Sequence, residues 1–359
     1  MVDFRRVGVL ADDFSGAGDV ALAFEAAGFS TEIWAPVGGK PRQPDAGVRV
    51  WILDTESRGL PPLEAARRVR RALTALAPWK PSFIFKKIDS TLRGPVGAEV
   101  AAFVGKLRPD RPVPLVPAFP RMGRSTVGGR HFVEGVSLDR SAFGSDPRHP
   151  ARLSRVEDIV ALPEPFRARV WVPDVENDRQ MAGVARRALA GRCAIGSAGF
   201  AAALAHGMAG KKVTRKMSGR SVPLVGPPVV GVVVGSAHPL TERQADRLKN
   251  GTRRGPWHLI ERPLERGVPA KILHRVVLQA RLMEKVHRIR RWVVTGGETA
   301  FALARLWRSA RWRVVAAVES GVPVCRSVGE SPRVVAIKPG GFGSEKALVR
   351  AVRFLSRKD

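Results

Sequence analysis

The sequence predicts an α/β fold with two domains, each a largely parallel sheet flanked by helices. Short apolar, β-branched runs alternate with helical patterns along the chain, which is typical of parallel sheets. The chain has 359 residues, enough for two domains of ordinary size. A stretch rich in lysine, glycine and proline interrupts the alternation at residues 210–228, and the alternation then resumes. We therefore expect domains over 1–209 and 229–359, joined by a linker over 210–228.

The first domain is predicted from strands and helices that follow one another in order. Apolar runs indicate buried strands at residues 7–11, 48–53, 82–88, 113–118 and 168–173. Helical patterns follow at 19–28, 62–77 and 97–107. In the second of these helices the apolar residues recur at helical spacing, so we assign its arginines to a solvated face.

The second domain repeats the same rhythm after the linker. Strands are expected at 229–235, 292–297, 313–318 and 333–338. Helices are expected to begin at Thr241, Thr299 and Ser344. This order again favours a largely parallel sheet with helices on its faces.

The chain is strongly basic, with 61 lysines and arginines against 32 acidic residues and a formal net charge of +29. Such a balance attracts phosphate-bearing partners, so nucleic-acid binding stays an alternative function. The excess is spread along the chain rather than gathered in a tail, and no basic-aromatic alternation accompanies it. We therefore do not expect nucleic acid to be the main partner.

Other classes of protein are excluded by what the sequence lacks. The two cysteines, Cys193 and Cys325, match no zinc or disulfide spacing. No apolar run approaches the roughly 20 residues that a membrane helix needs, and the N-terminus has no signal-peptide pattern. We expect a soluble, cytoplasmic protein without a membrane partner.

Three carboxylates surround the segment that follows the first strand, at Asp12, Asp13 and Asp19. We expect a tight turn over 15–18 and then a helix. In open α/β sheets ligands bind where strands end, and carboxylates there can bind sugar hydroxyls, hold a metal or act as a general base. The structural alternative is that Asp13 or Ser15 caps the helix and Asp12 is solvated. Three acids together favour a functional role.

A second polar cluster follows the strand at 82–88. Two cations, an acid, two hydroxyls and an arginine crowd before the next helix, at Lys86, Lys87, Asp89, Ser90, Thr91 and Arg93. The cations could hold the carboxylate of a polyhydroxy acid, and the acid and hydroxyls its hydroxyl groups. The structural alternative is a solvated loop in which Ser90 or Thr91 caps the helix.

The run over 116–150 is predicted to be a long, nearly structureless loop, because glycine and proline are frequent in it. Loops of this length inside a compact domain are usually functional. Its reactive members are Arg121, Arg124, His131 and Asp146. We interpret His131 as structural rather than catalytic.

Four glycine-rich turns follow strands in the second domain, at 235–236, 296–299, 320–321 and 339–344. Turns of this kind can cradle a polyphosphate with their backbone N–H groups. Neither the GxxxxGK[ST] loop nor the GxGxxG fingerprint occurs, so two common nucleotide motifs are absent from the sequence. The four turns together predict a nucleotide site.

Taken in order, these motifs resemble the four-carbon acid sugar kinase family, also called DUF1537 proteins. In the first domain the resemblance rests on ADDFSGAGD, KKIDSTLRG, PAFPRMGR and the turn at 196–199. In the second it rests on Gly235-Ser236 with Thr241 and Gln244, on GGET at 296–299, and on KPGGFG at 338–343. The fragment DFSGAGD also imitates a loop of ribokinase-like kinases, in which the last aspartate is the base, and that reading stays an alternative.

The resemblance implies an ATP-dependent phosphotransferase that acts on the terminal 4-hydroxyl of threonate, erythronate or 3-oxo-tetronate, with the active site in the interdomain cleft. We hypothesise that one carboxylate among Asp13, Asp19 and Asp89 orients or deprotonates that hydroxyl, with Asp13 preferred. The sugar acid would contact Asp12, Ser15, Lys87, Ser90, Arg93 and Arg124. ATP, with Mg²⁺ bridging its phosphates, would contact Ser236, Gly296, Gly297, Glu298, Thr299, Gly340 and Gly341. No metal ligand is assigned, and a homodimer is the candidate assembly.

Overall fold

The computed structural model describes residues 4–145, 150–210, 217, 222, 225–251, 256–261 and 269–357. Within them the chain forms two compact units. The first comprises 4–31 and 41–210, and the second comprises 32–40 and everything from 217 onward. Most of the expected linker over 210–228 lies outside the described residues, and so does Asp146.

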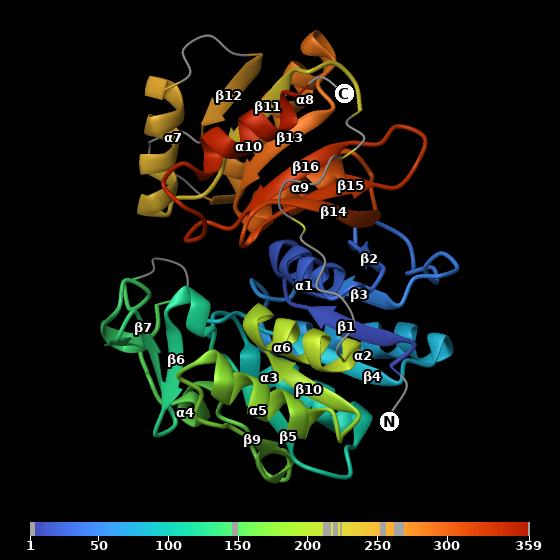
Figure 1. Cartoon of the computed structure of the whole chain (residues 1–359), viewed down its shortest axis with the longest axis vertical. Coiled ribbons are helices and arrows are strands. Elements are labelled where there is room, and N and C mark those ends of the chain that lie inside the picture. The colour runs from blue at the N-terminus through green and yellow to red at the C-terminus, as the bar shows by residue number, and fades with distance from the viewer. Residues whose placement is uncertain are drawn as a thin grey trace. The chain divides into compact units, whose positions relative to one another are not determined.

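The first unit contains a parallel sheet in the order β3-β1-β4-β10-β5-β9 (Figure 1). Every residue of β1 and β3 is buried, since helices cover both faces. The strands are β1 (Val7–Ala11), β3 (Val50–Asp54), β4 (Phe83–Lys87), β5 (Val113–Val116), β9 (Val170–Trp171) and β10 (Cys193–Gly196).

Helices α2 and α3 pack together on one face of this sheet, and α1, α5 and α6 pack together on the other. The helices are α1 (Phe14–Ala26), α2 (Pro62–Leu76), α3 (Val96–Leu107), α4 (Val156–Val160), α5 (Asp178–Ala188) and α6 (Ala198–Ala209). Short 3₁₀ turns lie at Ala77–Trp79, Pro120–Met122, Leu138–Arg140 and Arg167–Arg169.

The expectation of a tight turn over 15–18 is wrong, because these residues form the first turn of α1. The Asp13 side chain caps the helix by accepting a hydrogen bond from the Gly16 N–H at 2.8 Å. This cap lets the helix begin at Phe14, directly after the acidic pair. Gly16 suits the position, since a Cβ there would lie 2.7 Å from an Asp13 carboxylate oxygen.

The run over 116–150 is not structureless where it is described. It holds a small antiparallel sheet of β6 (Arg124–Val127), β7 (Arg130–Val133) and β8 (Val136–Ser137). Gly128 and Gly129 connect β6 to β7 with φ of 55° and 71°, which is the two-residue hairpin connection that favours glycine. The Asp174 carboxylate accepts both of their N–H groups, at 2.8 and 3.0 Å.

The second unit contains a mixed sheet. Four parallel strands run in the order β12-β11-β13-β16, and three antiparallel neighbours, β15, β14 and β2, continue it. The strands are β2 (Thr31–Trp34), β11 (Val230–Val234), β12 (Trp257–Glu261), β13 (Arg291–Thr295), β14 (Arg311–Glu319), β15 (Val322–Ser327) and β16 (Val334–Lys338). The turn predicted at 320–321 therefore joins an antiparallel hairpin.

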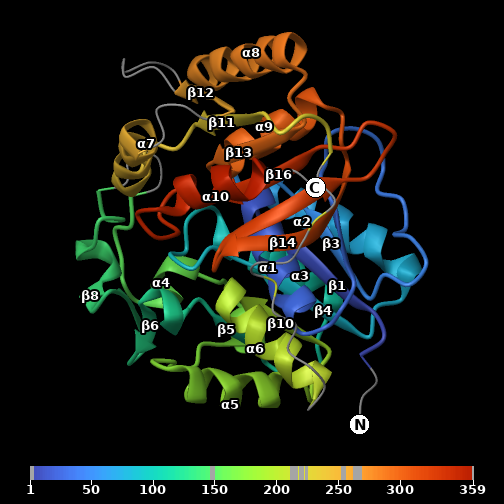
Figure 2. The same ribbon diagram turned by 45° about the horizontal axis from the view of Figure 1, so that its top comes forward.

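In the described part of the second unit, two helices pack on each face of this sheet. Figure 2 shows α8 (Pro269–His287) beside α9 (Gly297–Leu306), while α7 (Pro239–Gly251) packs against α10 (Ala347–Leu355). Among the described residues, no helix is long and apolar enough to cross a membrane.

Segment 32–40 belongs to the second unit although it comes early in the chain. Its strand pairs antiparallel with β14, with Trp34 opposite Arg311 and Ile33 opposite Trp312. The buried Glu32 carboxylate accepts two hydrogen bonds from the Arg311 guanidinium, both at 2.8 Å. The sequence-based boundaries do not include this excursion.

Candidate functional site

The candidate site of the first unit lies where β1, β3 and β4 end side by side. Because these strands are parallel, the residues that follow them meet at one edge of the sheet. The segments are Asp12-Asp13 after β1, residues 55–58 after β3, and residues 88–93 after β4. The structure thus brings together the two polar clusters predicted from the sequence and adds a third.

Arg58 joins the carboxylates of this edge. Its Nε donates to Asp12 Oδ2 at 2.8 Å, and its two terminal nitrogens donate to both oxygens of Asp13 at 2.7 Å. The Nη2 atom also lies 3.8 Å from Asp89 Oδ1. Sequence reasoning missed Arg58. The signal was the polar run DTESRG directly after a buried strand.

Asp89 is held by the arginine that follows it in the loop. Arg93 donates to both Asp89 oxygens at 2.8 Å, and Thr91 adds its N–H and hydroxyl. Burial alone would raise the pKa of Asp89, but Arg93 and Arg58 outweigh it and hold that pKa well below the usual range. Burial likewise opposes the charge of Asp12, and Arg58 and Lys87 lower its pKa. Both groups are therefore carboxylates at neutral pH.

Asp13 has its lone pairs occupied. Besides Arg58, it accepts from the Gly16 N–H and from the Ser15 hydroxyl at 2.6 Å. Both oxygens thus have two donors each. The capping role considered as the structural alternative is present in the structure, and it leaves neither oxygen of Asp13 without donors.

Asp19 differs from Asp13 and Asp89 in its contacts, although Asp12 Oδ1 and Asp54 Oδ2 likewise lack a hydrogen-bond partner among the described residues. Within the described part of the chain, the Asp19 Oδ1 atom is buried without a hydrogen-bond partner. Burial raises the pKa of Asp19 to about 7, with Lys87 lowering it and Asp13 raising it. A carboxyl group with a pKa near 7 and an unengaged oxygen has the properties of a general base.

Lys86 and Lys87 take separate roles at the end of β4. Lys86 is fully buried, lies 3.1 Å from Glu99 Oε2 and donates to the Lys87 carbonyl. Lys87 points the other way, with its ammonium 3.9 Å from Asp12 Oδ1. Lys86 is therefore structural, and Lys87 is the lysine of the carboxylate cluster.

A second acid pair, the buried Asp54 and the half-buried Glu56, adjoins the cluster. Glu56 accepts the Phe14 N–H at 2.9 Å, and its own N–H donates to Asp54. Burial raises the pKa of Asp54 to about 8, and burial together with Asp54 raises that of Glu56 well above its usual range. Glu56 also has φ of 44°, a left-handed backbone unusual for a side chain of this kind. The sequence analysis did not single out this pair.

His131 ties the small sheet to the loop of the second cluster. Its Nε2 lies 2.7 Å from the Ser90 carbonyl oxygen, so the Nε2–H donates and Nδ1 accepts from the Thr126 hydroxyl at 3.2 Å. Arg124 is also buried and donates to the Met122 carbonyl. These contacts agree with the interpretation of His131 as structural.

We expect His131 to make the protein acid-sensitive. Burial lowers its pKa to about 4 from 6.5, so the unfolded chain binds a proton between these values that the folded protein does not. The free energy of unfolding should therefore fall by up to about 3 kcal/mol as the pH drops from about 6.5 to about 4. His131→Gln should lose less stability over that range in urea titrations, whereas the exposed-site control His206→Gln should match wild type. Equal acid sensitivity in both variants would contradict this account.

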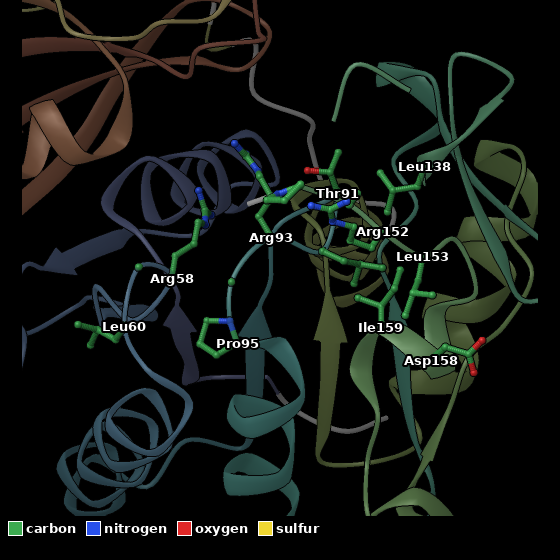
Figure 3. A pocket seen from close by; sticks show the side chains of 15 residues that line it. Arg58, Leu60, Thr91, Arg93, Pro95, Leu138, Arg152, Leu153, Asp158 and Ile159 are labelled. Carbon is green, nitrogen blue, oxygen red and sulfur yellow. The ribbon is translucent and has the colours of Figure 1, made fainter. Parts of the chain in front are cut away.

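A cavity of about 370 Å³ adjoins the cluster. Figure 3 shows Arg58 and Arg93 on one side of it, with Thr91 and Arg152 also lining it. Its remaining wall is largely apolar and includes Leu60, Leu138, Leu153 and Ile159. This volume lies in the range of small-molecule sites.

Three of the predicted glycine turns converge in the second unit, at the carboxyl ends of β11, β13 and β16. A Cβ on Gly340 would lie 2.5 Å from Ser236 Oγ, and one on Gly296 would lie 3.7 Å from Ser236 N. The Thr295 hydroxyl accepts the N–H groups of Gly235 and Ser236 at 3.0 and 3.2 Å. Helix α9 begins at Gly297 without a side-chain cap. A helix N-terminus of this kind binds anionic groups.

The Lys338 side chain holds the turn that contains Gly340 and Gly341. Its buried ammonium donates to the Thr241 hydroxyl and the Gly340 carbonyl, both at 2.8 Å, and to Gln244. Burial lowers the pKa of Lys338 to about 7, while Glu319 opposes the shift. Glu319 accepts from the Ser344 N–H and hydroxyl, so the far end of the same turn is also held.

Gly235→Ala is expected to damage the turns of the second unit selectively. A Cβ there would lie 2.0 Å from Thr299 Oγ1 and 2.8 Å from its Cβ, which a β-branched helical residue cannot avoid. Overpacking of this kind costs about 1–3 kcal/mol, and a loss of that size in nucleotide binding would raise the KM for ATP by about 5- to 150-fold. The matched control is Gly251→Ala, whose Cβ would meet nothing within 4 Å. An unchanged KM for ATP in Gly235→Ala would contradict the assignment of these turns.

Two family models match the chain. The sugar-binding N-terminal domain model matches residues 7–164, and the nucleotide-binding C-terminal domain model matches residues 261–348. The carboxylate–arginine cluster lies within the first match, and the turns at Gly296 and Gly340 lie within the second.

Several solved structures resemble this one, among them two proteins of family DUF1537. A Haemophilus influenzae protein of family DUF1537 has a TM-score of 0.74 at 21% identity, with 96% of this chain and 98% of that chain covered. A DUF1537 domain from Bordetella bronchiseptica, solved with bound citrate as a domain-swapped dimer, has a TM-score of 0.52 at 26% identity, with 98% of each chain covered.

Curated relatives are named sugar-acid kinases. The D-erythronate kinase of Heliobacterium modesticaldum is 37% identical over 156 residues, which are 44% of this chain and only 36% of that relative. The D-threonate kinase of Cupriavidus necator is 30% identical over 414 aligned positions, covering 96% of both chains. On this near full-length similarity, the chain belongs to the four-carbon acid sugar kinase family.

Proposed function

We propose that this protein is an ATP-dependent kinase that phosphorylates the terminal 4-hydroxyl of a four-carbon sugar acid: threonate, erythronate or 3-oxo-tetronate. The carboxylate–arginine cluster at the edge of β1, β3 and β4 is the observation that carries the proposal. Within one small region, its carboxylates can accept hydrogen bonds from the hydroxyl groups of a substrate, and its arginines can donate to the carboxylate of that substrate. The names of the relatives support the same substrate class.

The sugar acid is proposed to lie at the cluster and the adjoining cavity. Lys87, Arg93 and Arg124 would hold its carboxylate, and Arg58 joins that set because it lines the cavity. Asp12, Asp89 and Ser90 would accept or donate to its hydroxyl groups. Ser15 is less suited to this role, since its hydroxyl already donates to Asp13.

ATP is proposed to bind the converging turns of the second unit, with its phosphates on Ser236, Gly296, Gly297, Thr299, Gly340 and Gly341. Mg²⁺ takes most of its ligands from phosphates and water, so the protein needs to supply few. Among the described residues no group of three or more histidine, cysteine or acidic side chains could hold a metal. Glu298, in the first turn of α9, is the carboxylate nearest in sequence to these turns.

The proposed reaction is a direct phosphoryl transfer. The substrate hydroxyl oxygen forms a bond to the γ-phosphorus while the bond from that phosphorus to ADP breaks. The hydroxyl proton passes to a carboxylate. We assign that role to Asp19 rather than Asp13, because Asp19 has the unengaged oxygen and the pKa of about 7.

The two alternatives have less support. In ribokinase-like kinases the DFSGAGD-type loop lies beside the ATP phosphates, but here it lies within the residues matched by the sugar-binding model. Nucleic-acid binding would use the arginines alone, and it gives no role to the buried carboxylates of the cluster.

The test is a coupled ADP-release assay over D- and L-threonate, D- and L-erythronate and their 2-oxo and 3-oxo relatives. Turnover with at least one of them, dependent on ATP and Mg²⁺, is the expected result. Failure with every member would contradict the substrate class.

A cytoplasmic location and a homodimer complete the proposal. The Bordetella relative was solved as a domain-swapped dimer, which supports the second part. Light scattering on the purified protein would distinguish a dimer from a monomer.

A further inference from the structure

A second cavity lies at the opposite edge of the second unit's parallel strands. It has a volume of about 640 Å³ and is lined by residues that precede β11, β13 and β16 and by the ends of α8 and α9. The glycine turns follow the other ends of the same strands. Five-residue strands span about 16 Å, so this cavity is separate from the turns assigned to ATP.

The cavity carries a large excess of positive charge. Among the described residues, five cations line it against one carboxylate: Arg281, Lys285, Arg288, Arg290 and Arg333 against Glu284. Glu284 is already saturated, since Oε1 accepts from Arg333 and Arg290 and Oε2 accepts from the Trp307 indole N–H. One charge cannot neutralise five, so the lining keeps a net charge of about +4.

Hydrogen bonds and ring contacts hold the side chains at the floor of the cavity in place. The Arg333 guanidinium lies 5.2 Å from the Trp307 ring centroid while it donates to Glu284. Trp307 in turn packs against Trp292 and Trp312, at 5.7 and 6.3 Å between ring centroids. The stem of Arg290 packs where a Cβ on Gly226 would stand, at 2.7 Å.

The rim is formed by cations that are exposed. Arg281 and Lys285 are one helical turn apart on α8, and Arg288 follows the helix with a left-handed φ of 52°. Within the described residues, no ion pair joins these three to a carboxylate. The negative end of the α8 dipole explains a cation such as Lys285 in the last turn. It does not explain Arg281, more than a turn earlier, or the arginines that come from other elements.

We infer that this cavity binds a small anion that carries two or more phosphate groups. Guanidinium groups match phosphate oxygens in paired hydrogen bonds, and several of them converge here from different elements. A ligand with three or four negative charges would balance the lining, whereas a single carboxylate would not. The volume fits a small molecule. The inference does not depend on the proposed kinase activity.

Calorimetric titration with tripolyphosphate tests the inference. Arg281→Gln/Arg288→Gln removes two rim cations, and Arg275→Gln/Arg353→Gln removes two exposed arginines of the same unit outside the cavity. We expect the affinity to fall by about tenfold or more in the first variant, which loses two charge-assisted contacts, and to stay at the wild-type value in the control. An equal fall in both variants would show that only the general charge of the protein is involved, and would overturn the inference.

A third variant separates this cavity from the ATP turns. Gly235→Ala disturbs the turns at the other edge of the sheet. It should keep the tripolyphosphate binding that Arg281→Gln/Arg288→Gln loses. Complete loss of tripolyphosphate binding in Gly235→Ala would place the anion at the turns instead. Circular dichroism of every arginine variant should match wild type, because all four substituted arginines are exposed.

Discussion

Replacing Asp19 with asparagine should lower kcat by about 10²- to 10⁴-fold, the usual contribution of a general base. The substituted amide keeps the shape of the side chain but cannot accept the hydroxyl proton. The wild-type kcat should also fall below about pH 7 as Asp19 becomes protonated, because burial raises its pKa to about 7. The coupled ADP-release assay, run as a pH profile, measures both effects.

Asp13→Asn is the control variant, because its pH profile shows whether Asp13 rather than Asp19 is the general base. Asp13 already accepts four hydrogen bonds, so its replacement should act on folding and on substrate position more than on the pH profile. If the acid limb near pH 7 persists in Asp19→Asn and disappears in Asp13→Asn, the roles assigned here are reversed.

Asp19→Asn should also change the stability of the protein, independently of its effect on kcat. The folded pKa of Asp19 lies above its usual value of 3.8, so the folded protein binds a proton that the unfolded chain releases between pH 3.8 and about 7. The stability contributed by this proton is present below pH 3.8 and is lost as the pH rises through about 7. Asp19→Asn should therefore be more stable than wild type by up to about 4 kcal/mol at about pH 8 and nearly equal to it at about pH 4.

The position of the candidate site could be predicted from the sequence for a simple reason. Parallel strands place their carboxyl ends at one edge, so residues that follow different strands meet there. Asp12 and Asp89 are 77 positions apart in the sequence, yet both contact Arg58. The same rule explains why the turns at Ser236, Gly296 and Gly340 converge, whereas the predicted turn at 320–321 joins an antiparallel hairpin.

The pairing of side chains could not be predicted in this way. The sequence gives no measure of which arginine reaches which carboxylate, so Arg58 was missed although its strand was expected. Nor does composition show that the Asp13 carboxylate caps a helix, whereas one oxygen of Asp19 accepts no hydrogen bond from the described residues. Roles within the cluster depend on distances of a few ångströms.

Long-range strand pairing was the other limit. Residues 31–34 pair with a strand almost 280 positions later, and the buried Glu32–Arg311 ion pair holds them there. Likewise β15 runs antiparallel between β14 and β16, which an alternation of strands and helices does not predict. Hydrophobic periodicity identifies a strand but not its neighbour.

Arg58→Met should be the most destabilising single change at the cluster. The methionine fills much of the same volume but leaves Asp12 and Asp13 without their main counter-charge, and both are almost fully buried. Removing one partner of a buried ion pair costs about 3–5 kcal/mol, because the remaining charge is buried and uncompensated. Urea unfolding at neutral pH measures this loss.

Two further variants distinguish lost charge from lost packing. Arg58→Lys keeps the charge but cannot donate to both carboxylates in the same fork geometry, so it should recover only part of the stability. Arg58→Met/Asp13→Asn removes a carboxylate together with its partner, and it should be more stable than Arg58→Met alone. If the double variant is less stable than Arg58→Met by the full cost of Asp13→Asn, the two residues are not coupled. Arg58 would then act through its packing and not as the counter-charge of the cluster.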